Sequence, residues 1–120
     1  MFLVGYPEPE VIWYREPTRS EGNTQLQQLN DNMKYEITKL IATTTLRFQE
    51  AWYVLRIKNV EANDYTKYFC VARNRIGENR QTVIELFGKY EILIFMLCKI
   101  GLDMFCNCNI TLVLLYTEST

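Results

Sequence analysis

The stretch LRIKNVEANDYTKYFCVARNRIG, residues 55–77, decides the fold of this chain. Apolar and polar residues alternate on both sides of a turn at Asn63-Asp64, which is typical of two half-buried strands joined by a corner. The alternating positions are Leu55 and Ile57 before the turn, and Tyr68, Cys70 and Ala72 after it. Asn74-Arg75-Ile76-Gly77 then offers a hairpin loop into a third strand.

A second informative stretch lies near the start of the chain. Gly5-Tyr6-Pro7-Glu8-Pro9 has turn and polyproline chemistry, and it leads directly into the β-rich stretch Val11-Ile12-Trp13-Tyr14. This part resembles the B-C loop and C strand of immunoglobulin domains of the intermediate (I-set) type. Residues 55–77 resemble the E-F-G region of the same family, in which the corner Tyr stands two residues before the second core cysteine.

The resemblance implies an all-β fold, an Ig-like β-sandwich over about residues 4–87. In the family the first core cysteine falls at a position that is Met1 here. The sandwich is therefore expected to be incomplete, lacking strand A and most of strand B, with an irregular hydrophobic extension over residues 88–120. Without the inter-sheet disulfide, which would contribute about 2–5 kcal/mol, marginal stability is expected. The implied structural core comprises Trp13, Leu55, Ile57, Asp64, Tyr68, Cys70 and Ala72.

Two of these core residues are assigned roles at the corner. The Tyr68 hydroxyl is expected to bond to the backbone, and Asp64 to hold the turn or to pair with a basic side chain such as Arg56. A catalytic Asp would need a partner group, and the sequence offers none.

The expected partner face consists of apolar residues on the outer side of the C and F strands. They are Ile12, Tyr14, Phe69 and Val71. An apolar cluster where solvent is expected often marks a binding surface. Cover by the middle of the chain or by the tail is the alternative explanation. Trp52 and Val54 raise the same question on the opposite sheet.

The middle of the chain is the least regular part of the sequence. Residues 16–33 are polar and show no apolar period, so they are expected to form a connection without strands. Tyr35-Glu36-Ile37 predicts a short strand, and the Thr-rich residues 41–48 predict an extended hairpin arm.

The tail after Gly88 is open to three interpretations. It is apolar, but Lys99, Asp103 and two Asn residues interrupt it, so it is a poor transmembrane or anchor segment. It could be an unstructured extension. Alternatively, the alternation of Ile94, Met96, Cys98 and Ile100 would suit a strand B that folds back and brings Cys98 toward Cys70.

The composition argues against several functions. The net charge is −1 with interspersed signs and there is no His, so neither nucleic-acid binding nor His-based catalysis is indicated. The four cysteines show no metal-ligand spacing. We expect this protein to use no cofactor and no metal, and not to be an enzyme. Asn109-Ile110-Thr111 matches the N-glycosylation pattern, but it lies in a tail of doubtful structure in a chain with no export signal, so it is interpreted as a chance match.

The resemblance narrows to the third, membrane-proximal Ig domain of lachesin-like, neurotrimin-like and Dpr-interacting neural adhesion proteins. It implies a cell-surface recognition module in adhesion or axon guidance, binding other Ig-superfamily proteins homophilically or heterophilically. The membrane would be reached only through the parent protein's anchor. The alternatives are an intracellular structural module of the muscle type and a non-functional partial gene product.

Overall fold

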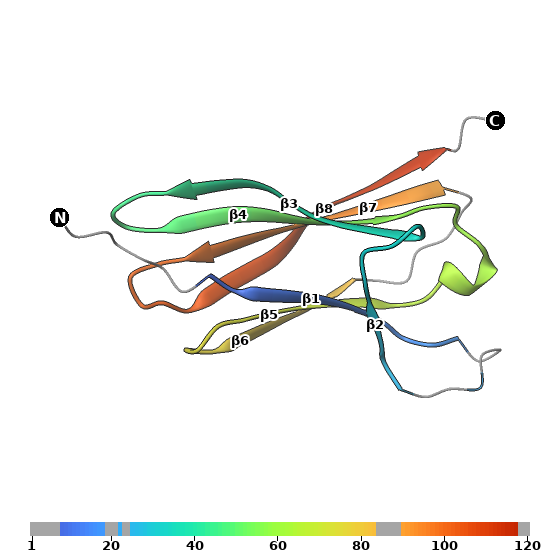
Figure 1. Ribbon diagram of the computed structural model, residues 1–120, viewed down its shortest axis with the longest axis horizontal. Coiled ribbons are helices and arrows are strands. Elements are labelled where there is room, and N and C mark those ends of the chain that lie inside the picture. The colour runs from blue at the N-terminus through green and yellow to red at the C-terminus, as the bar shows by residue number, and fades with distance from the viewer. Residues whose placement is uncertain (1–7, 19–21, 23–24, 84–89, 118–120) are drawn as a thin grey trace.

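The computed structural model describes residues 8–18, 22, 25–83 and 90–117. Within them the chain forms two four-stranded antiparallel sheets that pack face to face (Figure 1). The all-β sandwich expected from the sequence is confirmed. The expected domain limits, Val4 and Phe87, lie outside the described residues.

The strands of each sheet come from both halves of the chain. The first sheet has the order β2-β1-β5-β6, with β1 Glu10–Arg15, β2 Gln27–Leu29, β5 Tyr68–Arg73 and β6 Glu78–Val83. The second has the order β3-β4-β7-β8, with β3 Tyr35–Thr44, β4 Gln49–Ile57, β7 Tyr90–Ile100 and β8 Cys106–Thr117. A short 3-10 turn, Ala62–Asp64, connects β4 to β5 across the two sheets.

The core lies between the sheets and follows the period-two alternation of the strands. Leu55 and Ile57 of β4 are fully buried, as are Trp13 of β1 and Tyr68 and Cys70 of β5. Val60 packs at the edge of this cluster. Burying an aliphatic or aromatic side chain of this size contributes about 1.5–3 kcal/mol, so these strands hold each other mainly through this layer.

The tail is not irregular, and that expectation was wrong. All of β4 pairs with β7, with Leu55 opposite Ile94, and β8 pairs with β7. The alternation Ile94, Met96, Cys98 and Ile100 points into the core, and each of these side chains is at most 3% exposed. The fold-back alternative is thus confirmed, because β7 and β8 occupy the places beside β4 that the resemblance assigns to strands B and A.

In the middle region of the chain, one feature was predicted from the sequence and another was missed. The hairpin of β3 and β4 is confirmed, with a register irregularity between Lys39 and Ala42. The absence of strands in residues 16–33 was wrong, because β2 pairs with β1 and places Leu29 opposite Trp13. Leu29 is 3% exposed, so this one apolar side chain attaches an otherwise polar strand to the core.

No helix among the described residues is long and apolar enough to cross a membrane.

Candidate interaction surface

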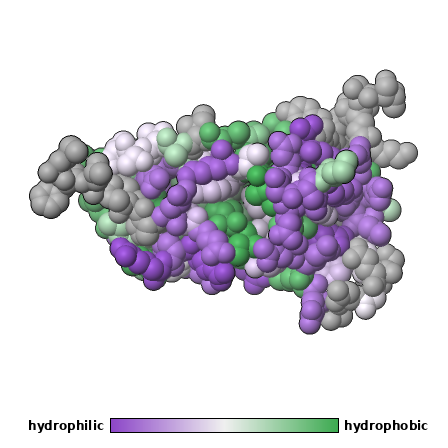
Figure 2. Space-filling model, viewed as in Figure 1, coloured by the Kyte–Doolittle hydropathy of each residue, from purple (hydrophilic) through white to green (hydrophobic). Residues whose placement is uncertain are grey.

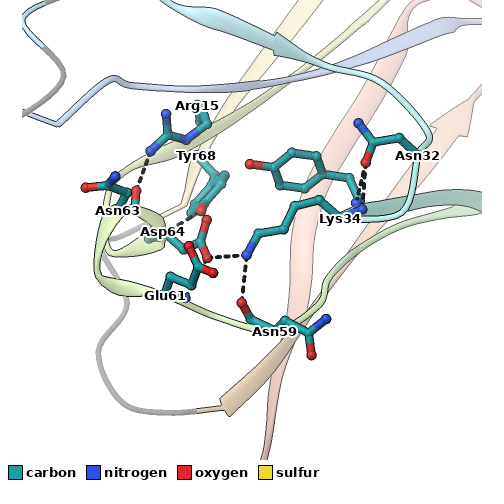
Figure 3. Close-up of polar contacts among 9 residues, drawn as sticks. Arg15, Asn32, Lys34, Asn59, Glu61, Asn63, Asp64 and Tyr68 are labelled. Carbon is teal, nitrogen blue, oxygen red and sulfur yellow. Dashed lines mark hydrogen bonds and ion pairs between the residues drawn. The ribbon is translucent and has the colours of Figure 1, made fainter.

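The corner between β4 and β5 is held by the residues that the sequence singled out (Figure 3). The Tyr68 hydroxyl donates to the backbone oxygen of Asp64 at 2.7 Å, and both side chains are buried. Burial raises the pKa of Tyr68 above its usual value, and the nearby charge of Asp64 raises it further. The Asp64 carboxylate accepts the Glu61 backbone N–H at 2.7 Å, which closes the 3-10 turn.

The basic partner of Asp64 is Lys34, whose Nζ lies 2.6 Å from the carboxylate. The Lys34 ammonium also donates to the backbone oxygen of Asn59 at 2.7 Å, so it lies between the two groups (Figure 3). Arg56, the expected partner, instead reaches Glu36 across the β3-β4 pair at 3.3 Å. The reason is position, because Arg56 lies on the outer side of β4. These contacts stabilise the corner.

The indole of Trp13 and the thiol of Cys70 lie directly across from each other on β1 and β5. Cys70 is a free, buried thiol, so the bond to Cys98 that the fold-back alternative would have allowed is not formed. Cys98 is bonded to Cys108 of β8, the residue directly opposite it, with a Cα–Cα distance of 4.0 Å. Burial raises the pKa of the Cys70 thiol, and desolvation does the same for free Cys106. Both thiols therefore remain protonated at neutral pH.

All seven expected core residues, Asp64 among them, are buried. Asp64 is 5% exposed and the other six are fully buried. The group therefore defines the interior, and any binding role has to be sought on the two outer faces of the sandwich.

The outer face of the first sheet brings the four expected partner-face residues together. Tyr14 lies opposite Phe69, and Ile12 lies opposite Val71, so the four side chains form two adjacent rows on β1 and β5. Ile12, Tyr14 and Phe69 are half-buried. Val71 lies on the same face but is only 7% exposed, so it is covered there, as the alternative explanation allows.

A basic side chain from β6 completes this face. Arg80 lies opposite Val71, and its guanidinium is 5.0 Å from the centre of the Phe69 ring. Glu10 and Arg73 form an exposed ion pair of 3.7 Å at the end of the same two strands. We call Ile12, Tyr14, Phe69, Val71 and Arg80 the β1-β5 patch. Aromatic residues and Arg at its centre and charge at its rim are the composition found in protein interfaces.

The outer face of the second sheet carries an open groove of about 490 Å³. Its lining combines apolar and charged side chains, namely Glu36, Thr38, Leu40, Val54, Arg56, Leu93 and Phe95. The Trp52 and Phe95 rings meet edge to face at its side, 6.5 Å apart. The two residues noted on this sheet behave differently, since Trp52 is half-buried and Val54 is 5% exposed. Figure 2 shows hydrophobic side chains gathered near the centre of a largely hydrophilic side of the molecule.

The comparisons with known proteins place this geometry in a family. Residues 3–86 match the model of the immunoglobulin I-set domain. This match covers more than half of the chain. The chain belongs to the immunoglobulin I-set family. Its relatives include neural cell adhesion molecule 1 of Homo sapiens, with 30% identity over 73% of this chain and 8% of the relative.

Two chicken proteins give similar values. Neural cell adhesion molecule 1 of Gallus gallus is 30% identical over 73% of this I-set chain, and neurofascin of the same species is 29% identical over 66%. The chain spans 7% and 4% of their lengths. No solved structure matches it. The chain is therefore an I-set domain homologous to neural cell adhesion proteins.

The family match ends before the hairpin of β7 and β8, and that is where sequence reasoning missed most. Cys98 and Cys108 stand opposite each other because of the register that β7 and β8 adopt after a shift between Phe95 and Met96. The alternation in β7 was the available signal, but outward-facing Leu93, Phe95 and Leu97 mask it. Among the described residues no three acidic, Cys or His side chains cluster as a metal site would require.

Proposed function

We propose that this I-set domain is a non-catalytic recognition module of a neural cell surface. In this proposal it binds other immunoglobulin-superfamily proteins, or a second copy of itself, during adhesion or axon guidance. The observation that carries the proposal is homology to neural cell adhesion molecule 1 and neurofascin together with an I-set sandwich. Among the residues that the structure describes, neither outer face brings together the nucleophile, base and oxyanion donors that an enzyme would need.

The Cys98–Cys108 disulfide supports the extracellular side of this proposal. Disulfides form and persist in secreted and cell-surface proteins, whereas cytosolic thiols are kept reduced. An intracellular structural module of the muscle type would not be expected to keep this bond.

The β1-β5 patch is the part of the surface that we propose contacts the partner. Tyr14 and Phe69 lie side by side, and Arg80 covers one side of the Phe69 ring. A partner that displaces water from the Tyr14 and Phe69 rings would bury apolar surface there, and no strand of the domain would have to unfold. The exposed Glu10–Arg73 pair would then lie at the polar rim and affect association rate and specificity more than affinity.

A bead-aggregation assay tests the proposal. Beads that carry the full chain are mixed with each other and with beads that carry ectodomains of other immunoglobulin-superfamily proteins. The variant Tyr14→Glu places a charge in the centre of the patch and is expected to reduce aggregation at least tenfold, since an unpaired charge at an interface core is costly. Leu40→Glu adds the same charge to the other sheet, where Leu40 is 56% exposed, and is expected to leave aggregation unchanged.

The two variants separate the outcomes. Loss with Tyr14→Glu alone supports the β1-β5 patch, provided that the variant keeps the wild-type unfolding midpoint. Loss with Leu40→Glu alone would move the contact to the groove on the second sheet. If wild-type beads aggregate with no partner and not with each other, the recognition function itself is contradicted.

A further inference from the structure

The acceptor pattern Asn109-Ile110-Thr111 occurs once in the 120 residues. It lies within β8, which the sequence did not predict to be a strand. Its interpretation as a chance match depended on a tail without structure. The tail forms two strands of the sandwich, so the structure shows how exposed these residues are in the folded domain.

The side chain of Asn109 is exposed, whereas its neighbour Cys108 is 1% exposed and points into the core. Because successive residues of a strand face opposite sides of a sheet, Asn109 projects from the outer face. Thr111 is exposed as well, and its hydroxyl donates to the backbone oxygen of Asn109 at 3.3 Å. The folded domain thus leaves the acceptor amide in solvent.

The position of β8 gives a large substituent room. β8 is the last strand in the order β3-β4-β7-β8, and no other described strand of this sheet lies beyond it (Figure 1). On the other side, Asn109 is opposite Leu97, and Leu97 is opposite Trp52. A branched sugar attached here would extend over solvent at the edge and over this apolar row on the face.

A disulfide on the same strand indicates the cellular compartment in which sugars are attached to such acceptor residues. Cys108, next to Asn109, is bonded to Cys98, as expected in the secretory pathway. We propose that Asn109 is an N-glycosylation site of this domain. The inference rests on the proposed function only for its compartment, and not on any partner or contact face.

The reaction needs one co-reactant, an oligosaccharide carried on a lipid pyrophosphate. The Asn109 side-chain nitrogen attacks the anomeric carbon of the first sugar, and a C–N bond forms while the anomeric C–O bond breaks. The lipid pyrophosphate leaves with the bonding electron pair, and the amide gives up one proton. No oxidation or reduction takes place, and the amide is left with one N–H.

A glycan at Asn109 would cover one part of the domain's surface and leave another part free. It would cover the row of Leu97 and Trp52 and the edge of β8, a strand that carries no charged residue over Cys106–Thr117. Uncharged, long edge strands are sites of unwanted pairing, and bulky polar cover prevents it. The β1-β5 patch lies on the other sheet and would remain free for a protein partner.

Translation of the full chain behind a cleavable secretion signal, with microsomal membranes present, tests the proposal. Chains that protease cannot reach are compared by gel mobility before and after treatment with a glycosidase specific for N-linked sugars. A single glycosidase-sensitive shift in the wild type is expected. Asn109→Gln and Thr111→Ala should each abolish it, Thr111→Ser should retain it, and Asn107→Gln, at an exposed neighbour outside the pattern, should leave it unchanged.

The gel shift does not require the chain to fold or to be secreted, because the sugar is transferred to the chain inside the microsomes, where protease cannot reach it. Protected wild-type chains without the shift would overturn the proposal. So would a shift that persists in Thr111→Ala. Failure of the bead assay would leave this result untouched, and absence of the glycan would leave the recognition function open to its own test.

Discussion

The segment from β1 to β6 and the hairpin of β7 and β8 complete one core by different means. The first segment carries the corner Tyr68, the Trp13–Cys70 pair and the family match. The hairpin lies beyond the match, its strand β7 has apolar side chains on both faces, and it has a disulfide of its own. The contrast teaches that a sandwich can take a strand from any segment whose inward side chains fill the gap, whether or not that segment carries a signature.

The largest effect is expected from charging the core on either side of the β4-β7 contact. Leu55 and Ile94 are opposite each other and fully buried. Leu55→Asp and Ile94→Asp should each abolish cooperative unfolding, because an unpaired buried charge costs more than about 4 kcal/mol. Lys99→Gln, at an exposed site of β7, is the control, and thermal unfolding followed by circular dichroism is the measurement. A cooperative Ile94→Asp variant would mean that the hairpin is dispensable.

Loss of the hairpin's disulfide is expected to have the next largest effect. The double variant Cys98→Ala/Cys108→Ala opens a bridge between residues ten apart and should lower the free energy of unfolding by about 2–3 kcal/mol. Cys70→Ala removes a buried thiol but no bond, and should cost about 1 kcal/mol or less. Urea unfolding of the three proteins measures the difference.

The pairing itself is checked by alkylating the denatured, unreduced chain. Cys70 and Cys106 should be labelled, and a disulfide-linked peptide should join Cys98 to Cys108. Label on Cys108, together with a linked peptide that joins Cys70 to Cys98, would instead show pairing across the two sheets.

Two buried tyrosines from the two sheets give a matched pair of smaller effects. Tyr68→Phe removes the hydroxyl that bonds to the Asp64 backbone and should destabilise by about 1 kcal/mol. The Tyr53 hydroxyl of β4 has no hydrogen-bond partner in the described part of the chain. Tyr53→Phe should therefore leave the free energy of unfolding unchanged or raise it by up to about 1 kcal/mol. Equal losses from both variants in urea unfolding would contradict this distinction.

The smallest effect is expected from alkaline pH. Burial, followed by the charge of Glu8, raises the pKa of Tyr53 from 10.0 to about 12. The unfolded phenol ionises first, so the stability present below pH 10 is lost as the pH rises from about 10 to about 12. At pH 10 the loss is about 0.4 kcal/mol for this group, since half of the unfolded phenol is ionised. Unfolding midpoints at pH 8 and pH 10 should differ less for Tyr53→Phe than for the wild type.

The sequence was sufficient for the elements whose side chains alternate. Residues 55–77 predicted β4, the corner and β5, and the Thr-rich stretch predicted the β3-β4 hairpin. β2 could not be found from its own residues, since two Gln and one Leu become a strand only by pairing with β1. The Lys34–Asp64 contact joins segments thirty residues apart, and it depends on how β3 lies against the corner.

The candidate surface was predictable in part, because strand alternation fixes which residues share a face. Ile12, Tyr14 and Phe69 were placed correctly on one side of β1 and β5 from that rule alone. The cover of Val71 and the position of Arg80 depend on β6, whose register the sequence left ambiguous. The groove on the second sheet depends on β7, so it was beyond reach while the tail was expected to be irregular.

The pairing of β7 with β4 also sets the order in which this domain can fold during synthesis. β7 follows β1 to β6 in the chain, so the ribosome delivers it last but for β8. Until then the nascent chain presents one open edge of β4, at the positions of Leu55 and Ile57 that later pair with β7. At about 5–20 residues per second, this apolar edge remains available to chaperones for seconds before the sandwich can close.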